Sequence, residues 1–373
     1  MKNENIWSYN KGEWSEAYTF TKLLGEAKVH ASDENLNKID DEFYPILKIL
    51  KIECGKIFFV NNNKNLIEIT DLKGKIQKAV KITDFLEISE KSFIKIKEGE
   101  GRSFTIPILE DFLKDLGILK FKSQSKSKAD LTMEIENLKT TLSKEYTFSI
   151  KSEIGNKSTF LNASKATNFI YKIDGIEEYE IDEIMRINKK TDKKWLKLRI
   201  LKILEKVDMK NYNLSFHSIE NEQFSKNLRL IDSNLPDIIS QVLLYYYSGK
   251  ISDIKSLTEL LIDKNPLKLS EDEKKLFYKS NMIELVKSAI FGMMPNEKWN
   301  KEYDVNGGIL IVKNNGVILC YHIFYNKKNL DEYLYQNTKF ETGSTNRYKT
   351  GDLYKIDGED GYYFKLNLQI RMK

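Results

Sequence analysis

Residues 129–136, Ala-Asp-Leu-Thr-Met-Glu-Ile-Glu, and residues 148–152, Phe-Ser-Ile-Lys-Ser, both alternate apolar and polar side chains. A period of two is typical of a β-strand that turns one face to the core and the other to solvent. In the first segment Asp130 lies on the polar face, and in the second Ser149 and Lys151 do so. We expect the two segments to pair as a hairpin that sets Asp130 beside Lys151.

A carboxylate at a strand start and a lysine on the neighbouring strand have the chemistry needed for metal-assisted hydrolysis of a phosphodiester. The carboxylate would hold Mg²⁺ against the scissile phosphate, and the lysine would position or help to deprotonate the attacking water. The spacing of Asp130 and Lys151 fits the nuclease signature Asp…(Asp/Glu)-x-Lys. Ser149 departs from the signature, because a second carboxylate is expected at its position.

Another acid must complete the metal shell if the site is real. Glu13 and Glu16 stand three apart at the start of an expected helix, which places them on one helix face, and Glu134 lies on the strand that follows Asp130. Each has a simpler interpretation, since acids favour the first turn of a helix and a polar strand face is often only solvated. Short signatures also arise by chance in a lysine-rich chain, so on the pattern alone the solvated strand face is favoured.

Two polar segments further along the chain suit contacts with nucleic acid. Residues 155–169 are dense in uncharged donors and acceptors, and residues 341–349 hold one of only six arginines. The expected last strand places Asn367, Gln369 and Arg371 on one face, and these residue types are shaped for bidentate contacts with bases. The alternatives are a loop of helix caps and the polar outer face of an edge strand.

The rest of the chain alternates between helical and strand periodicity. Helices are expected at 12–26 and 107–119, and a mostly helical block spans 175–300. Short β-rich runs form a small mixed or antiparallel subdomain; they are 46–52, 56–60, 66–70, 79–82 and 93–96. Strand periodicity returns near the C-terminus, at 309–312, 317–323 and 362–372.

Composition narrows the class of protein further. The 373 residues, 41% hydrophobic and 31% charged with a net charge of +5, permit a polyanionic partner without requiring one. No apolar run reaches the about 20 residues needed to cross a bilayer, so we expect a cytoplasmic protein with no membrane partner. The two cysteines and three histidines are scattered, which favours a metal held by oxygen, Mg²⁺ rather than Zn²⁺.

Several motifs occur in order along nearly the whole chain. They are Asn-Lys-Gly-Glu-Trp-Ser-Glu-Ala-Tyr at 10–18, Ala-Ser-Asp-Glu-Asn-Leu-Asn at 31–37, Phe-Ser-Ile-Lys-Ser at 148–152, Ser-Thr-Phe-Leu-Asn-Ala-Ser-Lys-Ala-Thr-Asn-Phe at 158–169, Ser-Thr-Asn-Arg at 344–347 and Leu-Asn-Leu-Gln-Ile-Arg at 366–371. Together they resemble the HpaII family of type II restriction endonucleases. The long central polar motif makes this resemblance specific.

The resemblance implies a fold and an activity. The fold would be α/β (α+β), a restriction-endonuclease-like core with a mixed β-sheet, plus a helical block and a small β-rich subdomain. The activity would be Mg²⁺-dependent cutting of double-stranded DNA at a short palindrome of the CCGG type. A cognate DNA methyltransferase would protect the host, and a palindromic target leaves open a homodimer.

The resemblance also assigns roles to residues. The expected catalytic set is Asp130, Lys151, Glu16 and Ser149, with Ser149 leaving the second acid in question. The expected metal ligands are Asp130 and Glu16, with Glu13 as the alternative on the helix and Glu134 as an outside choice. The expected DNA contacts are Ser152, Asn162, Ser164, Asn168, Arg347, Gln369 and Arg371.

Four segments follow from this assignment. Residues 1–122 would form the N-terminal helix and β-rich subdomain, 123–174 the catalytic strands and recognition motif, 175–300 the helical block, and 301–373 a β-rich region that completes the DNA-binding surface. Two other functions remain open at this stage. One is a nicking or repair nuclease of the same fold, and the other is a DNA-binding module without catalysis, which the serine in the signature makes conceivable.

Overall fold

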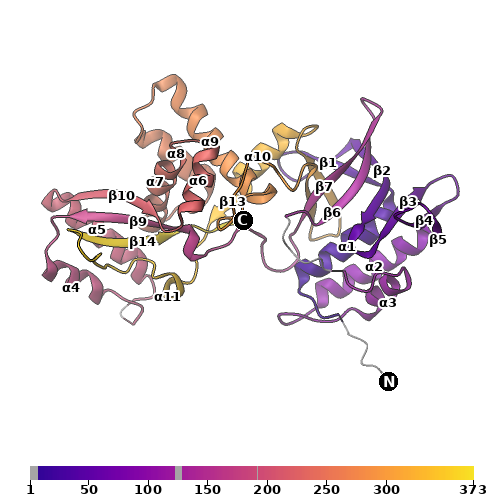
Figure 1. Cartoon of the computed structure of the whole chain (residues 1–373), viewed down its shortest axis with the longest axis horizontal. Coiled ribbons are helices and arrows are strands. Elements are labelled where there is room, and N and C mark those ends of the chain that lie inside the picture. Colours follow the sequence, from indigo (N-terminus) through magenta and orange to yellow (C-terminus); the bar gives the residue numbers. More distant parts are fainter. Residues whose placement is uncertain (1–6, 122–127, 191) are drawn as a thin grey trace. The chain divides into compact units, whose positions relative to one another are not determined.

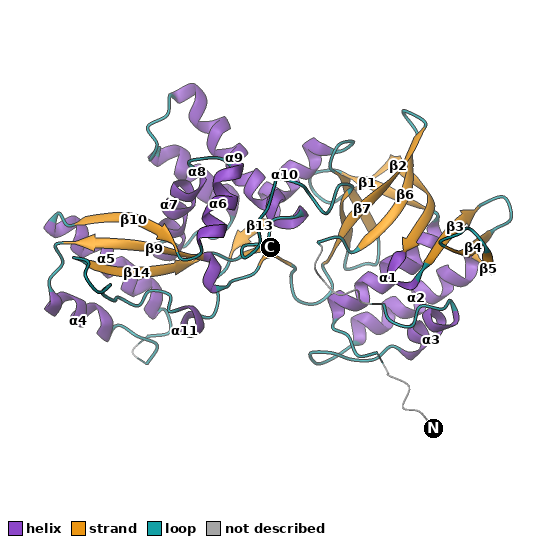
Figure 2. Cartoon of the chain, in the orientation of Figure 1, coloured by secondary structure: helices purple, strands orange, loops and turns teal. Residues whose placement is uncertain are grey.

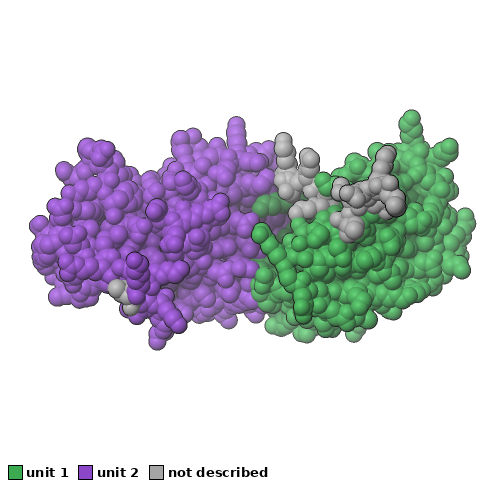
Figure 3. All heavy atoms as spheres, turned by 90° about the horizontal axis from the view of Figure 1, so that it is seen from below, with its two compact units in different colours: residues 1–158, 303–333 green, residues 159–302, 334–373 purple. Residues whose placement is uncertain are grey.

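The computed structural model describes residues 7–121, 128–190 and 192–373 of the chain. The chain divides into two compact units (Figure 3). Unit 1 comprises residues 1–158 and 303–333, and unit 2 comprises residues 159–302 and 334–373. Each unit therefore contains parts of the chain that are far apart in the sequence.

The two units cut across the four expected segments. The segment 123–174 is shared between the units because its strands pair in different sheets, and the segment 301–373 is shared for the same reason. Apart from Lys128, the polar stretch at 123–128 lies outside the described residues.

Unit 1 is built around a mixed β-sheet (Figure 1). Among the described residues, nine strands follow the order β1-β12-β11-β7-β6-β2-β3-β4-β5, with β1/β12 and β11/β7 parallel and the other pairs antiparallel. The long β2 also pairs with β1, so the sheet folds back on itself. The strands are β1 (Lys28–Ser32), β2 (Lys38–Lys51), β3 (Lys56–Asn61), β4 (Leu66–Asp71), β5 (Ile76–Lys81), β6 (Leu131–Asn137), β7 (Leu142–Ser152), β11 (Gly308–Val312) and β12 (Ile318–His322).

Three helices lie along one face of this sheet: α1 (Lys11–Glu26), α2 (Ile82–Glu98) and α3 (Pro107–Asp115) (Figure 1). The core between helices and sheet includes Trp14 and Phe20 of α1 with Phe58 and Phe148 of the strands, all without exposed surface. Burial of large aromatic side chains is the main favourable term in folding this unit. The helices expected at 12–26 and 107–119 are confirmed, the second ending at Asp115.

Two expectations for the N-terminal region are wrong. The run 93–96 is not a strand but the last turn of α2, in which Phe85, Ser89, Ser92 and Ile96 are buried at helical spacing. The other β-rich runs do not form a subdomain of their own, because β2 pairs with both β6 and β3 and so joins them to the central sheet. The short apolar runs were compatible with either periodicity.

Unit 2 is mainly helical, as expected for 175–300, and contains two small sheets (Figure 2). One sheet has the order β10-β9-β14 and the other β13-β15-β8. The strands are β8 (Thr159–Leu161), β9 (Asn168–Asp174), β10 (Asn213–Ile219), β13 (Thr338–Phe340), β14 (Tyr362–Asn367) and β15 (Ile370–Met372). The helices are α4 (Glu178–Arg186), α5 (Trp195–Lys210), α6 (Glu222–Ile231), α7 (Leu235–Ser248), α8 (Ile254–Lys264), α9 (Glu271–Phe291) and α11 (Thr345–Tyr348), while α10 (Lys327–Asn337) carries the chain from unit 1 into unit 2.

The expected last strand, 362–372, is two strands rather than one. β14 pairs with β9, whereas β15 pairs with β13 and β8, so the chain changes sheets between Asn367 and Ile370. Asn367 is buried in the first sheet, and the common face expected for Asn367, Gln369 and Arg371 is therefore wrong. Across the part of the chain that the structure describes, no helix has both the length and the apolar character to span a membrane.

Candidate active site

The candidate site begins with Asp130, which directly precedes β6. The predicted hairpin is confirmed: Leu131 pairs with Phe148 in antiparallel register, which sets Asp130 opposite Ser149. One carboxylate oxygen, Oδ2, accepts a hydrogen bond from the backbone N–H of Ile150 at 2.7 Å and one from the Ser149 hydroxyl at 3.0 Å. The neighbouring strand therefore fixes the orientation of this carboxylate.

Ser149 connects the aspartate to Lys151. The Lys151 ammonium donates to the Ser149 hydroxyl at 2.7 Å and lies 4.0 Å from Asp130 Oδ2. Ser149 is only 1% exposed, which corrects the expectation that it faces solvent. It is buried because its register neighbour Ile309, on β11, lies on a covered part of the sheet. The Ser149 hydroxyl thus connects the Asp130 carboxylate to the Lys151 ammonium, at the position where the signature expects a second acid.

Glu16 brings a second carboxylate to this place from α1. The hydroxyl of its neighbour, Ser15, donates to the hydroxyl of Ser152 at 2.9 Å, and both serines are buried, so the start of α1 is tied to the end of β7. Burial, together with the charge of Asp130, raises the pKa of Glu16 to about 8, while Lys151 opposes the shift. At neutral pH the Glu16 side chain therefore holds a proton that a cation would displace.

Two other acids from the sequence have structural partners. The Glu13 carboxylate accepts from the backbone N–H of Asn10 at 2.9 Å, and the Asn10 side chain accepts from the Glu13 N–H at 3.0 Å. This reciprocal pair is a capping box that starts α1. Glu134 forms an ion pair with Lys48 at 3.1 Å. Glu16 interacts electrostatically with both Asp130 and Lys151, which makes it the preferred candidate for the second acid.

Lys51, at the end of β2, is a site residue that sequence reasoning missed. It is only 5% exposed, and its ammonium lies 3.9 Å from the centre of the Phe121 ring. Burial lowers the pKa of Lys51, an effect opposed by the charges of Glu53, Glu16 and, more weakly, Asp130. The signal was in the sequence, since Lys51 is in phase with the buried Ile49 on an alternating strand.

A further lysine adds to the positive charge around the two acids. Burial lowers the pKa of Lys128, and the nearby charge of Lys151 lowers it further, while Asp130 and Asp304 oppose the shift. The backbone N–H of Lys128 donates to Asp304 at 3.0 Å, which holds this segment in place. Buried charged groups with shifted pKa values cluster at functional sites more often than elsewhere.

The donor set around Asp130 and Glu16 consists of oxygen atoms. Within the described residues, no group of three or more histidine, cysteine, aspartate or glutamate side chains could hold a metal. Mg²⁺ is commonly held by one or two carboxylates, with waters and substrate phosphates filling the other positions. The carboxylates of Asp130 and Glu16, with the Ser149 hydroxyl beside Asp130, fit such an ion.

Two of the expected DNA contacts are interior residues. Ser152 accepts from Ser15 and from the N–H of Ile154 at 3.0 Å. Asn168, 1% exposed, donates to Glu220 at 2.7 Å and accepts from Asn367 at 2.6 Å. Each of these two buried side chains makes its hydrogen bonds to other groups of the protein, which favours a structural role over a DNA contact.

Replacing Asn168 by Ala is expected to destabilise the protein by about 2 kcal/mol, because Asn367 would lose a buried partner. Urea unfolding measures this loss, and the affinity of the folded variant for DNA should stay within about threefold of the wild type. Asn162→Ala is the matched control, since Asn162 is exposed and its change should leave stability unaltered. A stable Asn168→Ala variant with relaxed sequence specificity would contradict this interpretation.

The remaining expected DNA contacts reach the surface of unit 2. Asn162 and Arg347 are exposed, and Ser164, Gln369 and Arg371 are partly exposed. Arg371 lies on β15, the middle strand of its sheet, where its register neighbours are Lys339 and Thr159. Its guanidinium forms an ion pair of 2.5 Å with Glu341.

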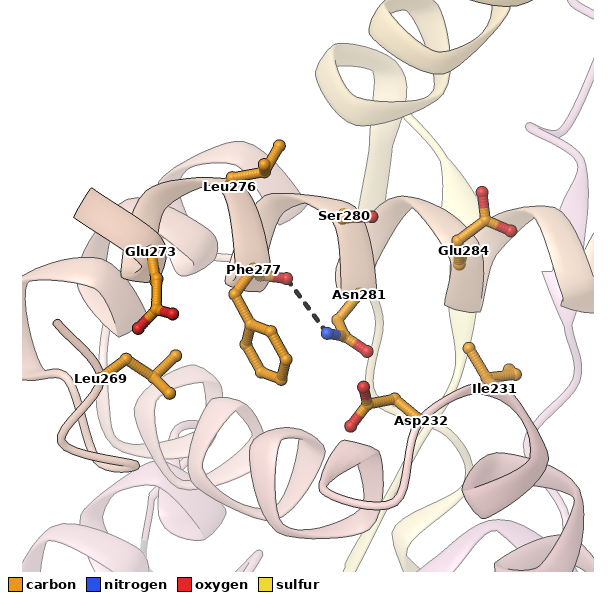
Figure 4. A pocket seen from close by; sticks show the side chains of 9 residues that line it. All are labelled: Ile231, Asp232, Leu269, Glu273, Leu276, Phe277, Ser280, Asn281 and Glu284. Carbon is orange, nitrogen blue, oxygen red and sulfur yellow. Dashed lines mark hydrogen bonds between the residues drawn. The ribbon is translucent and has the colours of Figure 1, made fainter. Parts of the chain in front are cut away.

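A hollow of about 550 Å³ beside α9 is lined by acidic rather than basic side chains (Figure 4). Asp232, Glu273 and Glu284 line it together with apolar side chains such as Phe277. Three carboxylates would repel a phosphate backbone. We therefore exclude this hollow as part of a surface for nucleic acid.

Comparison with known proteins shows that the chain is related to site-specific nucleases of the restriction endonuclease type. Residues 10–372 match the protein family described as HpaII restriction endonuclease. A curated relative, the type II restriction enzyme HpaII of Haemophilus parainfluenzae, is 36% identical over 369 residues, which cover 98% of this chain and 99% of the relative. No solved structure matches the chain. The chain belongs to the HpaII restriction endonuclease family.

Proposed function

We propose that this protein is a Mg²⁺-dependent type II restriction endonuclease that makes double-strand cuts in DNA at a short palindrome of the CCGG type. The observation that carries the proposal is the joint placement of Asp130, Ser149 and Lys151, with an ammonium 4.0 Å from a carboxylate that the strand holds fixed. Glu16 adds a second acid whose pKa is raised by burial. Membership of the family supports the substrate class.

Each charged side chain of this site would have its own role in phosphodiester hydrolysis. Asp130 and Glu16 would hold Mg²⁺, which supplies positive charge to the scissile phosphate when bound. Lys151 would orient the attacking water and stabilise the negative charge that develops on the phosphoryl oxygens. Ser149 keeps Lys151 and Asp130 in register, and Lys51 adds a buried positive charge near both acids.

The wider organisation follows from the same proposal. We interpret the sheet of unit 1, with α1 packed on it, as a restriction-endonuclease-like core that carries the chemistry. The exposed polar residues of unit 2, with Arg371 and Arg347 foremost, would contact the target. A cognate DNA methyltransferase would belong to the same system, and a palindromic site would suit a homodimer.

The decisive experiment is digestion of plasmid DNA with the purified protein and Mg²⁺, followed by sequencing of the fragment ends. Discrete double-strand fragments whose ends share one palindrome are the expected result. Nicked circles without linear fragments would instead identify a nicking or repair nuclease. Binding of duplex without cleavage at any Mg²⁺ concentration would identify a DNA-binding module.

Replacing Arg371 by Ala is expected to weaken binding of a CCGG duplex about 10- to 100-fold and to leave binding of a random duplex nearly unchanged, since a base contact carries sequence information and a phosphate contact does not. Fluorescence anisotropy at fixed salt measures both affinities. Glu341→Gln keeps the guanidinium while removing its ion pair, and serves as the control. An equal loss on both duplexes would assign Arg371 to the backbone.

A further inference from the structure

Unit 2 contains a basic hollow of about 340 Å³, here called the lysine hollow. Lys193, Lys194, Lys197 and Lys250 line it, and the lining includes no aspartate or glutamate. In a chain with 55 acidic residues, a hollow with four lysines and no acid is an uneven distribution of charge. Such a concave positive surface attracts anions.

The lysines of the hollow, of which Lys197 lies on α5, differ from other lysines of that helix. Lys202 and Lys206 of α5 form ion pairs with Glu183, and Lys206 also pairs with Glu180. In the described part of the chain, no carboxylate lies within 4.0 Å of the four ammonium groups of the hollow. A bound anion would therefore reduce the repulsion among these four ammonium groups.

The backbone around the hollow adds to the positive potential. α5 begins at Trp195, which lines the hollow together with Leu196 and Lys197, so the positive end of the helix dipole lies beside the hollow. Just before the helix, the Asp192 carboxylate accepts from the backbone N–H of Lys194 at 2.5 Å, and the Asp192 carbonyl accepts from the N–H of Trp195. The C-terminus of α7 also borders it. Two carbonyl groups there are already engaged, that of Leu244 by the Ser248 hydroxyl and that of Tyr245 by the Gly249 N–H.

Neutral donors and a recognition loop complete the lining. The Tyr246 hydroxyl and Thr342 are hydrogen-bonded at 3.0 Å, and both border the hollow together with Ser252 and Thr345. Thr342 and Thr345 belong to the polar segment 341–349, in which Arg347 is exposed. Hydroxyl groups and lysines together are the usual partners of phosphate oxygens.

We propose that the lysine hollow binds the phosphodiester backbone of duplex DNA and thereby positions the 341–349 segment for reading the target. This inference rests on the proposed function, because it assumes a DNA substrate. It gives the helical part of unit 2 a role, which is to bind duplex DNA with an affinity that does not depend on the sequence. Base recognition would come from other residues of the unit.

The test uses the full-length protein with Lys193, Lys197 and Lys250 all replaced by Gln. Anisotropy with a fluorescent CCGG duplex and with a duplex lacking CCGG, in buffer without divalent cations, gives both affinities over a range of salt. We expect each affinity to fall about 10- to 100-fold and the slope of log K against log salt to decrease by about 2 to 3. Lys250→Gln alone should reduce the slope by about 1.

The matched control removes the same charge elsewhere in unit 2, by replacing the exposed Lys226, Lys264 and Lys275 with Gln. Its slope should remain within about 1 of the wild type. Thermal unfolding confirms that each variant is folded. If the wild type bound neither duplex, the proposed function would fail. If the wild type bound DNA but the hollow variant kept its slope, or lost affinity for the CCGG duplex alone, the inference would be wrong.

Discussion

Asp130→Asn is expected to lower the rate of DNA cleavage at least about a thousandfold, because it removes a charged ligand of the Mg²⁺ that would act on the scissile phosphate. Lys151→Ala should do the same, because it removes an ammonium group that would stabilise charge on the phosphate. Asparagine keeps the shape of aspartate and can still accept hydrogen bonds from Ser149 and Ile150, so the fold should survive. Single-turnover cleavage of a linear duplex, with enzyme in excess, measures the chemical step. Binding of the same duplex without divalent cations should remain within about tenfold of the wild type.

Ser149→Ala provides the control for these two variants. It removes the hydroxyl that joins Lys151 to Asp130 but leaves both charged groups present. We expect a loss of about tenfold in rate, much smaller than for either charged residue, because the serine acts by positioning. Near-normal cleavage by Asp130→Asn or Lys151→Ala would show that the reaction uses other residues.

The central strand pair and most helices of this fold were predictable because their periodicity is strong. The alternation at 129–136 and 148–152 predicted that the two segments pair with Asp130 beside Lys151, and the observed register sets Asp130 opposite Ser149. The run 93–96 was not predictable as a helix, since four apolar and polar residues fit either period. The change of sheets between Asn367 and Ile370 depends on pairing partners that lie far away in the sequence, and local alternation carries no information about them.

The sequence predicted which residue types form the candidate site, but it did not predict what surrounds them in the fold. Asp130, Lys151 and Glu16 were found because their chemistry fits a known reaction, and the structure gathers them. The hydrogen bonds that fix Asp130 were not visible in the sequence, and neither was the burial of Asn168, which was expected to contact DNA. Lys51 was overlooked because lysine was read as a surface residue, although its phase with Ile49 indicated the interior.

The burial of Glu16 has a consequence for stability. Its pKa is about 8 in the folded protein against an ordinary 4.5, so the folded state binds a proton that the unfolded state releases. The stability from this group is complete below about pH 4.5 and is lost as pH rises to about 8. Glu16→Gln is neutral at every pH, and it should be more stable than the wild type at pH 9 by on the order of 5 kcal/mol, at about 1.4 kcal/mol for each pH unit between 4.5 and 8.

The same substitution is expected to reduce cleavage at least about a hundredfold, because a neutral amide is a poor ligand for Mg²⁺. In the wild type a proton and Mg²⁺ compete for Glu16, so the apparent affinity for Mg²⁺ should fall about tenfold for each pH unit below about 8. Mg²⁺ titrations of single-turnover cleavage between pH 6 and 9 measure this dependence, and thermal unfolding without divalent cations measures the gain in stability.

The two readouts for Glu16 separate a metal ligand from a residue that only packs. Glu13→Gln is the matched control, because it removes an acid from the same helix whose carboxylate caps α1. It should lower stability slightly and leave the Mg²⁺ and pH dependence of cleavage unchanged. A Glu16→Gln variant that gained stability at pH 9 but kept the wild-type requirement for Mg²⁺ would exclude Glu16 as a ligand. Asp130 would then remain as the proposed ligand, and Glu134 on β6 would be the next candidate for the second acid.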